Sequence, residues 1–399
     1  MPQERKFEHI TTDSHLVEFC EKAAGSEFIG FDTEFVSENR YRPELCLIQV
    51  AADEQLAIID TLAVKDVSPF WNLLVEGSHV TIAHAAREEQ LFCFRASDRT
   101  PANLFDVQLA AGFTGLEYPA SYGNLISRLL GITIDKGETR TDWKRRPLSQ
   151  SQIEYALVDV IHLRPLYDKL TQKLKSMERM EWLELETQQR TDALVRSEVE
   201  PQWHRMPGIS SLSRGPLAIV RQLWIWRDKE AKKRNRSPRR ILPDDLLVEV
   251  AKRGSRETRK LKAIRGLENR IAGGTLGAIA DTIGDALDLP KSEWPQRLPR
   301  GKSMNLGSLG QFLTTALGVV CRSNQIAPSI VGTAQDVRNL AAEKLGMVKL
   351  KEPPAMANGW RRELVGQLIE QILSGRIAIR VDDPRSDNPL VLEEVQDFE

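Results

Sequence analysis

The sequence predicts an α/β domain that is followed by two all-helical modules. Strand-like and helix-like segments alternate from residue 7 to about residue 110, and the sequence is mostly helical beyond residue 121. Two stretches rich in Pro, Gly and Ser interrupt the helical part, as is typical of linkers. We therefore expect four parts along the chain, at residues 1–200, 201–290, 303–380 and, as an acidic tail, 381–399.

The first part contains four short runs that are typical of strands. They are EFIGFDTEFV, LCLIQVAA, QLAIID and HVTIAHA, and they consist mainly of β-branched or other apolar residues. Helical patterns such as SHLVEFCEKAA and AREEQLFCF lie between or after them, and SYGNLISRLLG and QIEYALVDVIHL follow. This alternation predicts a sheet with helices packed on its faces.

The two helical modules are predicted from amphipathic segments that follow the linkers. The first linker, EVEPQWHRMPGISSLSRG, precedes an apolar stripe that comprises Leu217, Val220, Leu223, Trp224 and Trp226. We interpret both tryptophans as core residues. The second linker, LDLPKSEWPQRLPRGKS, contains three prolines and precedes the third part of the chain.

Composition excludes several classes of protein. Hydrophobic residues make up 41% of the 399 residues, yet no run reaches the roughly 18 apolar residues of a membrane helix. The N-terminus MPQERKFEHI lacks an apolar signal core, so we expect a cytoplasmic protein without a membrane partner. None of the four cysteines lies in a CxxC pair, which favours reduced, structural thiols.

Charge is distributed unevenly along the chain. Residues 201–300 contain 22 Lys and Arg but 11 Asp and Glu, so this segment carries +11. Because the whole chain has a net charge of −1, the remainder carries −12. The pattern predicts an acidic body with a basic middle module.

Two carboxylates interrupt the first buried strand. Asp32 and Glu34 are two residues apart, so they project from the same face of the strand. Adjacent carboxylates are costly to bury, and their hard oxygen atoms suit Mg²⁺ or Mn²⁺. A pair of solvated acids at a strand end is the alternative, since a D-x-E motif alone is weak evidence for a metal site.

Further acids occur in two predicted helices. Tyr155 and Asp159 are four residues apart on a strongly apolar helix, where they face a common site or hydrogen-bond each other. Glu88 and Glu89 begin another helix, where both complement the helix dipole or one of them completes a set of four carboxylates. Asp106 is predicted to be an N-cap.

In this order, the motifs resemble the DEDD exonuclease family, tyrosine subclass. The segments IGFDTEF, LCLIQVA, AHAAREEQLF, YGNLISRLLGI and RTDWKRRPLSQSQIEYALVDVIHLRPLYDKL are similar to ribonuclease D over nearly the whole first domain. The resemblance implies a ribonuclease H-like fold, with a mixed sheet and flanking helices. It also implies 3′→5′ hydrolysis of RNA, with nucleoside 5′-monophosphates as products.

The resemblance assigns roles to five residues. Asp32, Glu34, Glu89 and Asp159 would hold two divalent cations, Mg²⁺ or Mn²⁺, which stabilise the attacking and leaving oxygens. Tyr155 would orient the attacking water, because a phenol with a pKa near 10 is a poor base at neutral pH. The expected catalytic residues are therefore Tyr155, Asp32, Glu34 and Asp159. The family usually has Asp at the position of Glu89, so the oxygen atoms of this longer side chain lie about one bond further out.

Two basic segments are candidates for RNA contacts. Trp143, Lys144 and Arg145 in RTDWKRRPL suit a single-stranded backbone with stacked bases, although a structural loop with a packed tryptophan explains them equally well. Lys232, Lys233 and Arg234 belong to a segment that resembles the helicase-and-ribonuclease-D C-terminal (HRDC) domain, a nucleic-acid-binding unit. Residues 303–377 resemble a second, divergent copy.

The expected substrate is the single-stranded 3′ end of a structured RNA, such as a transfer RNA precursor, and the expected enzyme is a monomer. Two alternatives remain open. A catalytically weakened RNA-binding protein with the same fold is one, because Glu89 departs from the family pattern. A DNA 3′→5′ exonuclease is the other, although the chain lacks polymerase or helicase motifs such as a P-loop.

Overall fold

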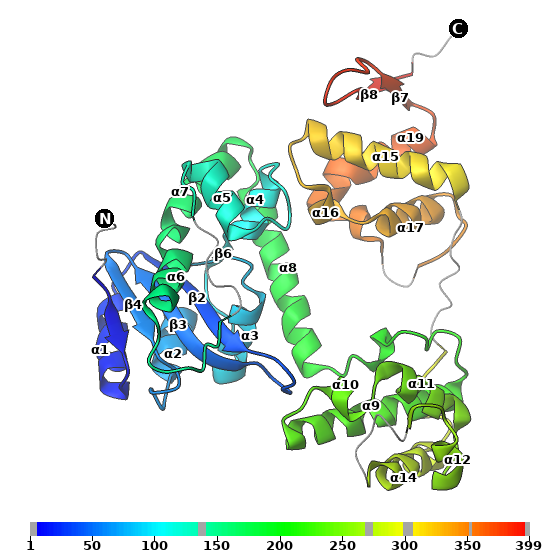
Figure 1. The fold of residues 1–399 in the computed structure, drawn as a ribbon. Helices are drawn as coiled ribbons and strands as arrows, with labels where there is room; N and C mark the ends of the chain where they lie inside the picture. The colour runs from blue at the N-terminus through cyan, green and yellow to red at the C-terminus, as the bar shows by residue number, and fades with distance from the viewer. Residues whose placement is uncertain (1–5, 135–140, 268–273, 298–305, 351–352, 396–399) are drawn as a thin grey trace.

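The protein consists of one sheet-containing domain and two helical modules, in the predicted order (Figure 1). The computed structural model describes residues 6–134, 141–267, 274–297, 306–350 and 353–395. This confirms the predicted α/β class for the first part of the chain and the helical class for the two modules, up to the end of α19 (Gln367–Leu373).

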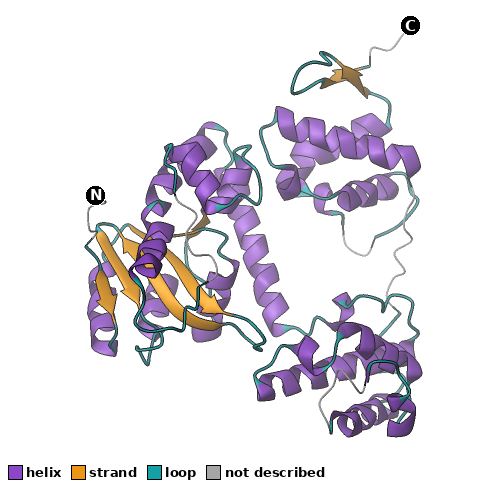
Figure 2. Ribbon diagram, viewed as in Figure 1, coloured by secondary structure: helices purple, strands orange, loops and turns teal. Residues whose placement is uncertain are grey.

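A six-stranded mixed sheet forms the centre of the first domain (Figure 2). Its strand order is β1-β4-β3-β2-β5-β6, in which β3 runs antiparallel to both of its neighbours and the other neighbouring pairs are parallel. The bounds are β1 (Glu8–Ile10), β2 (Phe28–Val36), β3 (Glu44–Ala52), β4 (Gln55–Ile59), β5 (Val80–Ala83) and β6 (Leu104–Asp106).

Helices cover both faces of this sheet, because alternate residues of the central strands are apolar on each side. On one face, Ile29 and Phe31 pack with Phe70 and Trp71 against α1, α2 and α3. On the other face lie α4, α5, α6 and α7 (Figure 1). The bounds are α1 (Asp13–Ala23), α2 (Ser68–Glu76), α3 (Arg87–Ser97), α4 (Val107–Phe113), α5 (Tyr122–Leu130), α6 (Gln150–Ile161), α7 (Leu163–Ser176) and α8 (Met180–Val199).

The first helical module has an apolar core of its own. Leu217, Val220 and Leu223 are buried in it, and Trp224 and Trp226 pack partly buried against it. Its elements are η1 (Trp203–Arg205), α9 (Arg214–Arg234), α10 (Pro238–Ile241), α11 (Asp244–Arg253), α12 (Thr258–Lys262) and α14 (Thr275–Asp288).

The second helical module shares its core with the first, sheet-containing domain. Trp360, 3% exposed, stacks on Trp182 of α8 and meets Phe113 of α4 edge-on. Arg179 donates to the carbonyl oxygens of Phe113, Asn324 and Gln325, which links the two parts further. The elements of the second helical module are α15 (Gly307–Ser323), α16 (Pro328–Val331), α17 (Ala334–Lys344), η2 (Ala355–Ala357), α18 (Gly359–Arg361), η3 (Arg362–Gly366) and α19 (Gln367–Leu373).

The C-terminal segment corrects one expectation. Residues 381–399 were expected to form an acidic tail, but β7 (Ile377–Val381) and β8 (Leu390–Glu394) pair as an antiparallel hairpin. Ile377, Ile379 and Leu392 pack against the shared core, and these apolar contacts hold the hairpin in place. Residues 396–399 lie outside the described part of the chain.

Candidate active site

Three carboxylates come together between the sheet and α6. Asp32 and Glu34 project from β2, and Asp159 projects from α6, which crosses β2 and β3. One oxygen atom from each carboxylate lies within 4.8 Å of those of the other two. The structure therefore brings together three of the four acids that the sequence singles out.

Local sequence places α6 against the sheet. The helix begins at a capping box, in which the Ser149 hydroxyl and the Gln152 side chain satisfy each other's backbone N–H groups. Ala156, Leu157 and Val160 are buried on its inner side. Tyr155 and Asp159, one turn apart, lie at the edge of this apolar side and face the carboxylates of β2.

Gly30 allows the close approach of the next helix. A Cβ atom at this position would lie 3.1 Å from Cδ1 and 3.3 Å from Cβ of Leu163, the first residue of α7. Because Gly30 lies two residues before Asp32 on the same face of β2, the missing side chain lets the α6–α7 junction lie directly over the acids.

The three carboxyls are held in an environment that opposes their ionisation. Burial and then the charge of Asp159 raise the pKa of Asp32 to about 8. Burial and then the charge of Asp32 raise the pKa of Glu34 to about 9. Burial raises the pKa of Asp159 to about 7. No Lys or Arg of the described residues lowers any of these values.

This donor set fits a divalent cation. Closely spaced carboxylate oxygens without a positively charged partner are the ligands that Mg²⁺ and Mn²⁺ prefer. A cation between them would stabilise the ionised forms that burial and mutual repulsion disfavour. The number of cations and the metal remain predictions.

Glu89 lies close to this group but outside it. Its side chain, in the first turn of α3, is 5% exposed. Its Oε1 accepts a hydrogen bond of 2.7 Å from the hydroxyl of Thr33, on the opposite side of β2 from Asp32 and Glu34. Burial and then the charge of Asp32 raise the pKa of Glu89 to about 8, so the two carboxyls interact. Metal ligation by Glu89 stays a prediction.

Asp106 fixes the backbone that leads into α3. As predicted, it is the N-cap of α4, where it accepts from the N–H groups of Gln108 and Leu109. It also accepts from the N–H groups of Ala85 and Ala86, 3.0 Å each, just before α3 begins. Ala85 has a left-handed φ of 57°, and these bonds stabilise that unfavourable conformation.

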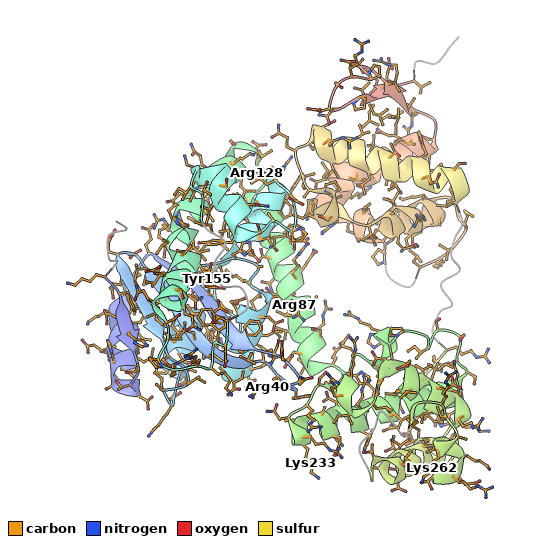
Figure 3. The ribbon with its side chains drawn as sticks, viewed as in Figure 1. Arg40, Arg87, Arg128, Tyr155, Lys233 and Lys262 are labelled. Carbon is orange, nitrogen blue, oxygen red and sulfur yellow. The ribbon has the colours of Figure 1, made fainter. Side chains whose placement is uncertain are left out.

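The phenol of Tyr155 borders the carboxylate group. Figure 3 labels Tyr155, which lies on α6. Burial and then the charge of Asp159 raise its pKa well above the usual range. Its hydroxyl hydrogen-bonds Asp159 and lowers the pKa of that carboxyl against the larger effect of burial. A neutral phenol in this position can orient a water molecule but cannot act as a base at neutral pH.

The structure does not offer Trp143 as a surface for stacked bases. Its ring is 5% exposed and packs among Leu47, Leu157 and Tyr155. This corrects the stacking expectation and agrees with the alternative of a structural loop. The physical reason is the apolar surface between α6 and the sheet, because an aromatic ring is more stable when packed against such a surface than when exposed to water.

The cations of the same loop differ from one another. The Lys144 ammonium forms an ion pair of 2.9 Å with Glu44 at the start of β3, and Arg145 is exposed. Arg146 binds Asp60 with two nitrogen atoms and also donates to the carbonyl of Cys46, so its role is structural. Arg140 lies outside the described residues.

The basic residues of the first module lie at the C-terminal end of α9. Lys232, Lys233 and Arg234 are exposed, and Lys233 is labelled in Figure 3. Arg234 forms an ion pair with Glu230 one turn earlier. The structure therefore places the three residues on an accessible surface, and RNA binding by them stays a prediction.

Three polar side chains next to the acids are absent from the sequence prediction. Buried Gln49 of β3 faces Asp32 across the strand pair and donates to its Oδ2 at 3.1 Å. Thr33 binds Glu89, as described above. Burial and then the charge of Asp159 raise the pKa of Tyr122 well above its usual range. Gln49 alone left a signal, as an amide within the apolar run LCLIQV.

No helix in the described ranges is both long and apolar enough to span a lipid bilayer.

Comparison with known proteins gives matches to both the first domain and the first helical module. The profile described as 3′-5′ exonuclease matches residues 7–175, and that of the HRDC domain matches residues 217–277. Ribonuclease D of Gluconacetobacter diazotrophicus is 34% identical over 382 residues, which cover 94% of this chain and 95% of that protein. Ribonuclease D of Sphingobium indicum is 32% identical over 382 residues, 94% of this chain and 97% of that protein.

A solved structure is also similar over most of the chain. The crystal structure of Escherichia coli RNase D, described as an exoribonuclease involved in structured RNA processing, superposes with a TM-score of 0.80 at 27% identity. The match covers 93% of this chain and 99% of that chain, so it includes the helical modules.

Proposed function

The chain belongs to the ribonuclease D family and is a 3′→5′ exoribonuclease, and from this premise we propose that it trims the single-stranded 3′ ends of structured RNAs, such as transfer RNA precursors. The proposed products are nucleoside 5′-monophosphates. The proposed cofactors are two divalent cations, Mg²⁺ or Mn²⁺. The predicted monomeric state and cytoplasmic location are part of the same proposal.

One observation carries this proposal: the oxygen atoms of Asp32, Glu34 and Asp159 lie within 4.8 Å of one another, next to the phenol of Tyr155. These three carboxylates would hold the cations, with Glu89 as the fourth ligand. When bound, the cations would neutralise the crowded charge and lower the pKa of the attacking water.

The chain's own residues supply the rest of the chemistry. Tyr155, kept neutral by its raised pKa, would accept a hydrogen bond from the attacking water, or donate one to it, and so orient it for in-line attack. Gln49 fixes the orientation of Asp32 by donating to Oδ2. The three acids are half-buried beside the apolar side of α6, and this partial burial strengthens each of these interactions.

Two observations support structured RNA as the substrate. The similar protein from Escherichia coli is described as involved in structured RNA processing. In this chain, the matched HRDC domain presents exposed Lys232, Lys233 and Arg234, which suit phosphate groups upstream of the cleaved end.

A 5′-labelled hairpin RNA with a single-stranded 3′ tail tests the proposal. With Mg²⁺ or Mn²⁺, the tail should shorten one nucleotide at a time, with release of 5′-monophosphates, while a matching DNA tail competes poorly. Asp32→Asn should reduce the rate by about 100-fold or more, because it removes a charged ligand from the metal group. An uncut tail in both metals, or cleavage that Asp32→Asn leaves unchanged, would contradict the proposal.

Two neighbouring glutamates provide a matched test of the fourth ligand. Glu89→Gln should weaken the response to added Mn²⁺ if the carboxylate turns from Thr33 toward a cation. Glu88→Gln is the control, because Glu88 pairs with Arg87 at the surface. Equal metal responses of the two variants would favour the alternative of a weakened site, in which Glu89 stays bound to Thr33.

A further inference from the structure

The loop between β2 and β3 leaves the nuclease domain and contacts the first helical module. At its tip, the Tyr41 hydroxyl donates to both carboxylate oxygens of Asp228 on α9, at 3.1 Å and 3.0 Å. A hydrogen bond to an ionised acceptor is stronger than one between neutral groups. This contact joins residues that are 187 positions apart in the sequence.

Three further hydrogen bonds, made by Asn39 and by the backbone of Tyr41, reinforce the contact. The Ser237 N–H donates to the Asn39 carbonyl at 3.4 Å, and Arg240 Nε donates to Asn39 Oδ1 at 3.2 Å. In the other direction, the Tyr41 N–H donates to Asn235 Oδ1 at 3.4 Å. The loop therefore contacts the C-terminal end of α9 and the residues that follow it.

A third link connects the loop with two helices of the nuclease domain. Arg42 binds Glu198 at the end of α8, at 2.9 Å. Arg95 of α3 binds the same carboxylate with two nitrogen atoms, at 2.8 Å and 3.0 Å. The loop, the helix that leads to the first module and the helix that carries Glu89 are thus held together.

The same hairpin carries the active-site acids. Asp32 and Glu34 lie on β2, and a register shift follows directly between Glu34 and Phe35. At the base of the loop, Glu44 forms ion pairs with Arg40, at 2.6 Å, and with Lys144, which precedes α6. A continuous set of contacts therefore runs from the acids to α9.

We propose that Tyr41 is a positioning residue that fixes the basic end of α9 relative to the active site. An RNA strand long enough to reach Lys232 and Lys233 then binds a surface at a defined distance from the acids, whereas a very short strand does not. Figure 3 labels Arg40 and Lys233, which belong to the two sides of this junction. The inference rests on the proposed function, since it concerns RNAs that have more than a few nucleotides.

Substrate length separates positioning from chemistry. With the tailed hairpin RNA, Tyr41→Phe and Asp228→Ala should raise KM about tenfold, which corresponds to loss of one hydrogen bond to a charged group. With a labelled trinucleotide, kcat and KM should stay unchanged. Asp228→Asn should recover most of the loss, because the amide oxygen still accepts from the phenol. The double variant Tyr41→Phe/Asp228→Ala should be no worse than either single variant.

Tyr167→Phe is the matched control, because the contacts that the structure gives for Tyr167 are made by its ring, with Phe28 and Phe105. An unchanged KM for the tailed RNA in Tyr41→Phe, or an equal loss with the trinucleotide, would overturn the inference. Failure of the unmodified protein to shorten the tailed RNA, while it degrades the trinucleotide, would instead contradict the proposed function, and the inference with it.

Discussion

The two helical modules are attached to the nuclease domain in different ways. The C-terminal module, α15 to α19, shares an apolar core with α4, α7 and α8, centred on the Trp360, Trp182 and Phe113 rings. The first module has its own core and meets the nuclease domain through hydrogen bonds of Tyr41 and Asn39.

This difference separates stability from orientation. Apolar area removed from water contributes about 25 cal/mol per Å², so a shared core makes two parts unfold together. When a polar contact separates, its groups form hydrogen bonds to water instead. Such a contact therefore contributes little net stability, but it fixes the relative orientation of the two parts. We therefore expect the C-terminal module to act as part of the catalytic body, and the first module to act as an oriented but separate unit.

The largest expected effect is that of Trp360→Ala. The ring is 3% exposed, and its removal should lower the unfolding free energy by about 3–5 kcal/mol. Because the core is shared, urea denaturation followed by circular dichroism should show the nuclease domain unfolding earlier as well. A nuclease transition at the same urea concentration as in the unmodified protein would contradict the shared core.

Leu223→Ala makes the opposite test in the first module. Leu223 is buried in that module's own core, so the variant should lose about 2–5 kcal/mol there. The nuclease transition and the cleavage of a trinucleotide should be unaffected. If trinucleotide cleavage falls in parallel with the module's melting, the two units are not energetically separate.

In the metal-free protein, the stability of the nuclease domain should depend on pH, whereas that of the first helical module should not. The pKa values of Asp32, Glu34 and Asp159 are raised to about 8, 9 and 7, so the folded protein retains protons that the unfolded chain releases near pH 4. Their contribution is fully present below about pH 4 and is lost as pH rises through about 7 to 9, by at most about 1.4 kcal/mol per pH unit for each proton.

Thermal unfolding in a chelator, scanned from about pH 6 to about pH 9, measures this effect. Tm of the nuclease body should fall, Mg²⁺ or Mn²⁺ should restore it most at the alkaline end, and Asp32→Asn should flatten the profile. The transition of the first module should not follow. A nuclease Tm that rises over this range would show that the acids are ionised and paired in some other way.

The smallest effect is expected from the exposed cations of α9. Lys232→Ala combined with Lys233→Ala should weaken tailed RNA binding and make KM less dependent on salt, with a slope smaller by about 1 for each phosphate group that the variant no longer binds. Lys169→Ala, an exposed lysine of the nuclease domain, is the control. Identical salt slopes in both variants would place the RNA elsewhere.

Strand and helix periodicity accounts for what the sequence could predict about the site. A period of two places Asp32 and Glu34 on one face, and a spacing of four aligns Tyr155 with Asp159. Both follow from local geometry, and the structure brings the three acids together. The fold class was predictable for the same reason, since alternating patterns mark each element.

Tertiary packing decided the features that the sequence did not predict. Thr33 binds Glu89 because β2 and α3 are adjacent, and nothing in either segment indicates that pair. Trp143 lies in the core because α6 covers it, although its basic neighbours suggested a surface. The hairpin of β7 and β8 was missed because its few apolar residues stand among many acids and depend on a core formed by distant helices.

Gly30 determines how closely α6 approaches β2 at the catalytic centre. With a hydrogen atom in place of a methyl group, Leu163 rests directly on the strand, and the end of α6 descends with it. The distance between Asp159 and the two acids of β2 therefore depends on the absence of a side chain at Gly30. A Cβ atom at this position would push the helix away from the sheet and increase the distance between the carboxylates. The metal site would then be distorted, although none of its ligands had been changed.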